Sequence, residues 1–144
     1  MNIRTKAISA VCAACVVVSG FFYSERSMLN LREVDPPLQA VAECAIRHTP
    51  VDFVVIDGGR TAEEHQINVA NGKSWTTRSR HQDGKAIDIA AWVNGRITYD
   101  SAPYYQIAEA FYACSKELNV PIVWGGEWKA KDLMHFELDR RYYP

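Results

Sequence analysis

The chain has 144 residues, 48% of them hydrophobic, which suits one compact domain with its own core. It carries 16 basic and 17 acidic residues, for a formal net charge of −1. No basic run is interleaved with aromatic residues, so the composition argues against a nucleic-acid partner. We expect the protein to be a monomer.

The N-terminus is typical of an export segment. Two positive side chains in MNIRTK precede an uncharged run over residues 7–23, and small residues allow cleavage after Gly20. The run is also just long enough for an uncleaved, weakly hydrophobic anchor that enters the inner membrane and later leaves it. We therefore expect residues 1–20 to be a signal peptide or releasable anchor, residues 21–144 to be the functional domain, and the protein to be periplasmic or secreted.

Apolar periodicity and turn residues predict the following elements in chain order. A short helix or turn is expected over 24–34, and helices are expected over 38–48, 61–72, where Thr61 and Glu64 form a capping box, and 103–118. Strands are expected over 52–56, 86–93, 96–99, 120–124 and 135–138, with a hairpin turn at 94–95. This mixture predicts an α+β domain whose small sheet is mostly antiparallel and is flanked by helices.

The four cysteines fall into two pairs. Cys12 and Cys15 lie in the apolar N-terminal run without the context of a redox or zinc motif, so we interpret them as hydrophobic filler. Cys44 and Cys114 lie in the body of the chain. Their pattern leaves open whether they form a disulfide or stay buried and free.

Two separated segments supply candidate metal ligands. SRHQDGKAID contains His81 and Asp88, with Gly84 in a turn between them, and DLMHFEL places His135 at a strand start. Two imidazoles and one carboxylate, with a fourth position open to water, are typical of a catalytic zinc site. Gly84 is expected to permit a positive φ or a close backbone approach.

Hydrolysis also needs a base and a group that stabilises negative charge. Asp132, three residues before His135, is the candidate base. Arg60 follows a predicted strand directly, and its guanidinium is the candidate clamp on a substrate carbonyl or carboxylate.

SRHQDGKAID fills every position of the Ser-x-His-x-x-Gly-x-Ala-x-Asp motif of the zinc D-alanyl-D-alanine carboxypeptidase and L-alanyl-D-glutamate endopeptidase family, and DLMHFEL resembles its second motif. SERSMLNL, TPVDFVVIDGGRT and VWGGEWKAKDLMHFEL are similar to segments of the phage endolysin branch. The resemblance implies a Hedgehog/DD-peptidase-like fold, Zn²⁺ bound by His81, Asp88 and His135, catalysis by Asp132, and substrate binding by Arg60.

The same resemblance implies a substrate, the peptide stem of bacterial peptidoglycan. In the carboxypeptidase and dipeptidase branches of the family, the second motif resembles Glu-x-x-His, whereas this chain has Asp132 at the position of the glutamate. This difference favours the L-alanyl-D-glutamate endopeptidase branch. The chain differs from the endolysin branch in its apolar N-terminal segment, which would let the enzyme be exported by itself. D-alanyl-D-alanine carboxypeptidase activity and a noncatalytic, zinc-stabilised wall-binding module are the alternatives.

Other polar and aromatic candidates have simpler explanations. His48 ends a predicted helix and is expected to contact terminal carbonyls, and His65 lies within a predicted helix. Trp124 and Trp128 could line a groove or pack in the core. Glu137 is expected to be a surface charge.

Overall fold

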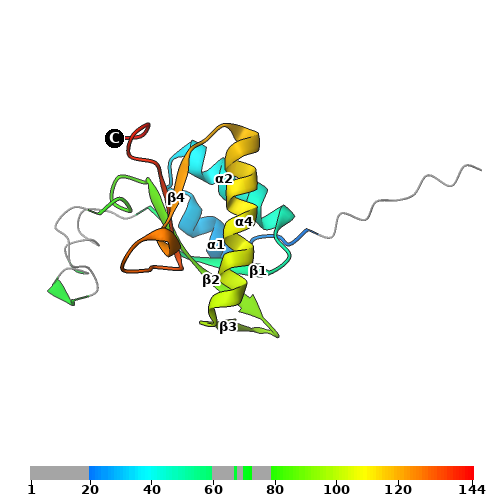
Figure 1. Ribbon diagram of the computed structural model, residues 1–144. Helices are drawn as coiled ribbons and strands as arrows, with labels where there is room; N and C mark the ends of the chain where they lie inside the picture. The colour runs from blue at the N-terminus through cyan, green and yellow to red at the C-terminus, as the bar shows by residue number, and fades with distance from the viewer. Residues whose placement is uncertain (1–19, 60–66, 68–69, 73–78) are drawn as a thin grey trace, which may run out of the picture.

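The computed structural model describes residues 20–59, 67, 70–72 and 79–144 (Figure 1). Its elements are α1 (Glu25–Leu31), α2 (Pro36–His48), β1 (Asp52–Asp57), β2 (Ala86–Val93), β3 (Arg96–Thr98), α4 (Ser101–Leu118), β4 (Ile122–Trp124), the 3₁₀ turn η1 (Gly125–Glu127) and β5 (His135–Leu138). Arg60, His65, the N-terminal segment before Gly20 and most of the predicted helix over 61–72 lie outside the described residues. Within the described part, no helix combines the length and apolar character that a bilayer crossing requires.

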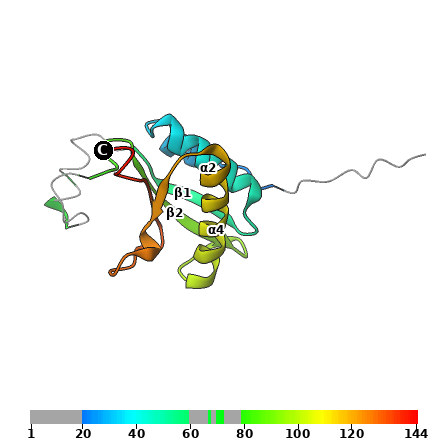
Figure 2. The same cartoon turned by 45° about the horizontal axis from the view of Figure 1, so that its top comes forward.

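The sheet is antiparallel throughout, with the order β1-β2-β5-β4. The long strand β2 lies against β1 and pairs with β5 through its first residues and with β3 through its last. Figures 1 and 2 show α2 and α4 packed against each other over the sheet. The predicted α+β fold with a small antiparallel sheet and flanking helices is therefore confirmed.

Aromatic residues join the sheet to α4. The rings of Phe111 on α4 and Phe136 on β5 are stacked with centroids 3.9 Å apart, and Phe53 on β1 lies 5.5 Å from Phe111. All three side chains are fully buried. Because aromatic burial supplies a large share of core stability, this cluster holds α4 against β1 and β5.

The short helix α1 supplies hydrogen-bond partners to the end of β1, where the strand pairing is irregular. Ser24 caps the helix by accepting from the backbone N–H of Ser27. The Ser27 hydroxyl then accepts from the Val55 N–H at 3.1 Å, and the Asn30 amide donates to the Val55 carbonyl at 2.8 Å. These bonds satisfy backbone groups where the β1 register shifts, and they position Gly58 just beyond the strand.

A disulfide joins the two main helices. Cys44 on α2 and Cys114 on α4 are bonded with their Cα atoms 5.8 Å apart, which answers the question that the sequence left open. The bridge spans a sequence separation of 70 residues. A loop of that length corresponds to about 4 kcal/mol of stabilisation through restriction of the unfolded chain.

Element boundaries differ slightly from those expected. α2 begins at Pro36 and not at residue 38, because proline suits the first helical turn, where no N–H is needed. α4 begins at Ser101, two residues before the expected start, and ends as expected at Leu118, where the left-handed φ of 54° at the C-cap Asn119 terminates the helix. Asn94 and Gly95 both have positive φ, as the predicted two-residue hairpin requires.

Candidate metal centre

Strand register brings two of the candidate ligands together. Asp88 on β2 is directly opposite His135 on β5, and Asp57 lies opposite Asp88 from the other side. Directly opposed residues in an antiparallel pair point to the same face of the sheet. Two segments that are 47 residues apart in the chain therefore present side chains to one point.

A tight turn presents the third candidate. His81 lies between Ser79, whose hydroxyl accepts from the His81 N–H, and Gly84, whose N–H donates to the His81 carbonyl at 3.1 Å. Gly84 has φ +69°, and a Cβ there would lie 2.8 Å from the Glu33 carbonyl oxygen. Both expected reasons for a glycine are present, and larger residues would displace the turn.

The three side chains converge. His81 Nε2 lies 3.5 Å from Asp88 Oδ2, and His135 Nδ1 lies 3.1 Å from Asp88 Oδ1. One potential ligand atom from each of the three residues falls within 4.8 Å of the others. The two histidines are buried, whereas the Asp88 side chain keeps 26% of its surface exposed, so the centre opens to solvent at the carboxylate.

Hydrogen bonds behind the two imidazoles fix which nitrogen faces the centre. His81 Nδ1 lies 3.0 Å from the Gly58 carbonyl oxygen. Since a carbonyl only accepts, Nδ1 donates to it, and Nε2 is the nitrogen that faces the centre. His135 Nε2 lies 2.9 Å from Glu137 Oε2, which leaves Nδ1 facing Asp88. Such outer partners orient metal-binding imidazoles.

The expectation that Glu137 is a surface charge was wrong. Its side chain is 4% exposed, and it accepts from Arg140 Nε at 2.9 Å as well as contacting His135. The signal was present in the sequence, because residues two apart on a strand share a face and Glu137 is two residues after His135. A carboxylate buried beside a histidine and an arginine is paired, so it need not face water.

The charges of the centre shift the pKa of its members. Burial alone would raise the pKa of Asp88, but hydrogen bonds with His135 and His81 hold it well below its usual range. Burial would lower the pKa of His135, yet Asp88 and Glu137 together raise it to about 9. Burial likewise opposes ionisation of Glu137, but His135 and Arg140 lower its pKa to about 2. The centre thus favours charged carboxylates around a position that attracts a cation.

Asp132 lies beside the centre on an exposed loop. Its carboxylate accepts from the Met134 N–H at 3.3 Å, and its carbonyl accepts from the His135 N–H at 3.4 Å. A Cβ on Gly125 would lie 2.4 Å from the Asp132 carbonyl oxygen and 3.2 Å from the His135 Cβ. The first glycine of the Gly-Gly turn is therefore what lets Asp132 and His135 pack side by side.

The two tryptophans have different roles. Trp124 is 4% exposed, stacks near Phe136 and donates through Nε1 to the Leu133 carbonyl, so it belongs to the core. Trp128 is 37% exposed, and its ring centroid lies 5.0 Å from that of His135. Trp128 thus forms part of the rim of the centre.

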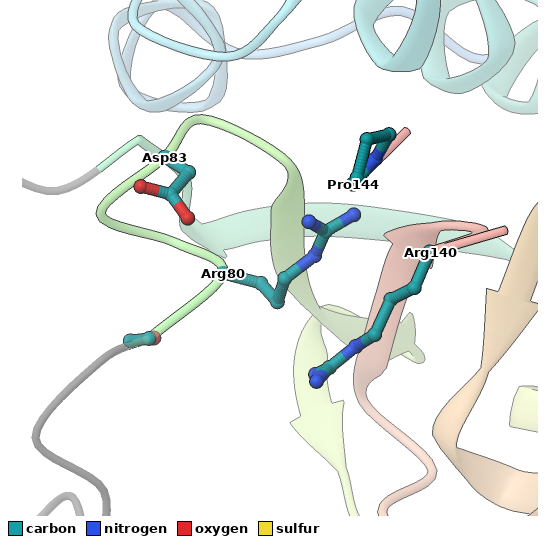
Figure 3. Close-up of a pocket in the computed structure, with 5 residues that line it drawn as sticks. Arg80, Asp83, Arg140 and Pro144 are labelled. Atoms are coloured by element: carbon teal, nitrogen blue, oxygen red, sulfur yellow. The ribbon is translucent and has the colours of Figure 1, made fainter. Parts of the chain in front are cut away.

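A separate pocket of about 450 Å³ lies near the C-terminus, lined by Ser79, Arg80, Asp83, Arg140 and Pro144. In Figure 3 the Arg80 guanidinium points toward Pro144, and the Arg140 side chain runs away from it. Arg80 Nη2 donates to the carbonyls of Leu138 and Tyr143. These two hydrogen bonds hold the C-terminal tail. The residues that line this pocket are not the candidate metal ligands.

Taken with the α+β fold, two buried imidazoles and a carboxylate at one solvent-accessible point are consistent with a metal-dependent hydrolase. A family model described as phage L-alanyl-D-glutamate peptidase matches residues 19–144. The chain belongs to that family, so the resemblance drawn from the two motifs is confirmed.

Individual relatives agree with the family match. An L-alanyl-D-glutamate peptidase of Escherichia phage T5 is 35% identical over 127 residues, covering 85% of this chain and 93% of the phage protein. The crystal structure of the Serratia marcescens L-Ala D-Glu endopeptidase ChiX is similar with a TM-score of 0.79 and 38% identity, over 90% of this chain and 98% of ChiX. An L-alanyl-D-glutamate peptidase of Listeria phage A118 is 26% identical, and the match spans 44% of its length.

Proposed function

We propose that this chain is a zinc-dependent endopeptidase that hydrolyses the bond between L-alanine and D-glutamate in the peptide stem of bacterial peptidoglycan. The observation that carries the proposal is the convergence of His81, Asp88 and His135 in a chain that belongs to the phage L-alanyl-D-glutamate peptidase family.

The donor atoms suit zinc. Ligand bonds of about 2.0 to 2.1 Å in a tetrahedron place neighbouring donor atoms about 3.3 Å apart. The separations of 3.5 Å from His81 Nε2 to Asp88 Oδ2 and of 3.1 Å from His135 Nδ1 to Asp88 Oδ1, each to a different carboxylate oxygen, are close to that value. Two imidazoles with one carboxylate also favour zinc over magnesium or calcium, which prefer oxygen ligands.

A bound zinc ion supplies a Lewis acid that activates water at neutral pH and polarises a carbonyl. We assign the proton transfers to Asp132, whose carboxylate is exposed three residues before His135. Asp132 accepts a proton from the attacking water and donates it to the amine of the departing D-glutamyl residue. Arg60, which follows Gly59 directly, is assigned to bind the substrate through its guanidinium fork.

Export fits the proposed substrate, because peptidoglycan lies outside the inner membrane. We propose that residues 1–20 carry the protein across, either as a cleaved signal or as a releasable anchor, and that residues 21–144 form the peptidase domain. The positive residues before an uncharged run support this assignment.

The test combines metal content with cleavage. The oxidised parent protein should contain about one zinc per chain and release new amino groups from purified peptidoglycan. His81→Ala should lose both the zinc and the activity, since two ligands hold a catalytic ion poorly. His65→Ala is the matched control and should keep both. Equal zinc loss from the two variants would overturn the ligand assignment.

A further inference from the structure

A second cluster of metal-binding side chains lies where α2 and α4 pack together (Figures 1 and 2). Cys44 and His48 are four residues apart on α2, and Cys114 and Glu117 are three residues apart on α4. These spacings place each pair on one face of its helix. The two faces meet at the disulfide.

The distances within this cluster are short. His48 Nδ1 lies 3.6 Å from Cys44 Sγ and 4.0 Å from Cys114 Sγ. Glu117 Oε2 lies 3.9 Å from Cys44 Sγ. An imidazole and a carboxylate therefore already flank the two sulfurs from both helices.

Solvent reaches the cluster from one side. The two cysteines are 8% and 1% exposed, whereas His48 and Glu117 are exposed. The His48 ring donates through Nδ1 to the Cys44 carbonyl at 2.8 Å, which holds it beside the bridge. A reductant and a metal ion can approach from the exposed side, where both polar side chains lie.

We propose that reduction of the Cys44–Cys114 disulfide creates a second zinc site, with Cys44, Cys114, His48 and Glu117 as its four ligands. A dithiol reductant supplies two electrons and two protons to the disulfide and becomes a disulfide itself. Zinc then displaces the two thiol protons as the zinc–sulfur bonds form. The His48 ring exchanges its hydrogen bond to the Cys44 carbonyl for a bond to the metal.

The geometry suits a closed structural site. Two thiolates on one tetrahedral zinc lie about 3.8 Å apart, given zinc–sulfur bonds of about 2.3 Å. Cα atoms 5.8 Å apart allow this separation through rotation of the cysteine side chains. The site shares no residue with the centre at His81, Asp88 and His135. Under reducing conditions it would connect α2 to α4 in place of the disulfide.

Cobalt is the probe, because cobalt bound to thiolates gives a near-ultraviolet charge-transfer band that a site made only of histidine and carboxylate lacks. The full chain is prepared with Cys12→Ser and Cys15→Ser, so that Cys44 and Cys114 supply the thiols. After reduction with a phosphine, titration with Co²⁺ should raise the band to the amplitude of one thiolate-bound cobalt per chain, whatever cobalt the His81, Asp88 and His135 centre takes up, and Zn²⁺ should remove the band. The oxidised protein should show no band.

Two variants test the other ligands. His48→Ala and Glu117→Gln should each weaken cobalt binding by the reduced chain about tenfold or more, whereas Arg47→Ala, at the neighbouring exposed position, should leave it unchanged. Equal affinity in the His48 and Arg47 variants would overturn the ligand set. So would the absence of a band in the reduced protein. Far-ultraviolet circular dichroism follows folding, and a reduced chain that loses its helices and does not regain them with zinc would also overturn the proposal.

Discussion

The buried carboxylate behind His135 gives a sharp test of how the candidate centre is organised. Glu137 accepts hydrogen bonds from His135 Nε2 and Arg140 Nε, each at 2.9 Å. In Glu137→Gln, one amide oxygen can serve only one of these donors well, and the amide NH₂ faces the other. His135 is then less firmly oriented and less basic at the nitrogen that faces Asp88.

The magnitude follows from the role of such outer partners. Loss of one typically lowers metal affinity or activity by about 10-fold to 100-fold, or about 1.4 to 2.8 kcal/mol of binding free energy. Glu137 is nearly fully buried, so solvent does not replace the lost interaction. Zinc affinity would be measured by competition with a chromophoric chelator, and folding would be followed by circular dichroism.

Glu109→Gln on the exposed face of α4 is the matched control and should leave zinc affinity unchanged. A folded Glu137→Gln protein whose zinc affinity stays within about twofold of the parent would refute the positioning role of Glu137. If Glu137→Gln does not fold, Arg140→Gln is measured in its place. This variant removes the exposed partner of Glu137 and should also weaken zinc binding.

Three further predictions concern catalysis, pH and export. Asp132→Asn should retain zinc while peptidoglycan cleavage falls by about 10²-fold to 10⁴-fold, the usual effect of losing a general base; activity within a few-fold of the parent would remove Asp132 from the mechanism. The pKa of His135 near 9 lies above its unfolded value, so its stabilisation of the metal-free protein is complete below about pH 6.5 and is lost as the pH rises through 9. Zinc must displace that proton, so zinc affinity should rise about tenfold per pH unit between pH 7 and 8, and a flat profile measured by chelator competition would contradict this. Residues 1–20 fused to a reporter enzyme should carry it across the inner membrane, and a reporter retained in the cytoplasm would end the export proposal.

Local patterns predicted most of the fold. The apolar run AIDIAAWV and the Asn94-Gly95 turn predicted β2 to the residue and its hairpin partner β3 to within one residue. Capping and proline effects at Ser24 and Pro36 explain where α1 and α2 begin. The pairing of β2 with β1 and β5, and of β5 with β4, was not readable in this way, because it depends on contacts between residues distant in sequence.

The candidate centre was predictable as a set of residues but not as a network. Spacing within two motifs identified His81, Asp88 and His135, whose convergence depends on the β2–β5 register. Glu137 was missed because a charged residue is normally assigned to the surface unless its partners are known. The Cys44–Cys114 bond was undecidable from sequence, because it requires the distance between two helices.

The bond that is cut tests the central claim most directly. Purified peptidoglycan is digested with the zinc-loaded protein, and the fragments are analysed by mass spectrometry and by identification of their new amino-terminal residues. We predict new amino termini on D-glutamate and stems shortened to L-alanine, abolished by a chelator and restored by zinc. Release of free D-alanine without new glutamyl amino termini would contradict the account, and so would cleavage that persists after the zinc is removed.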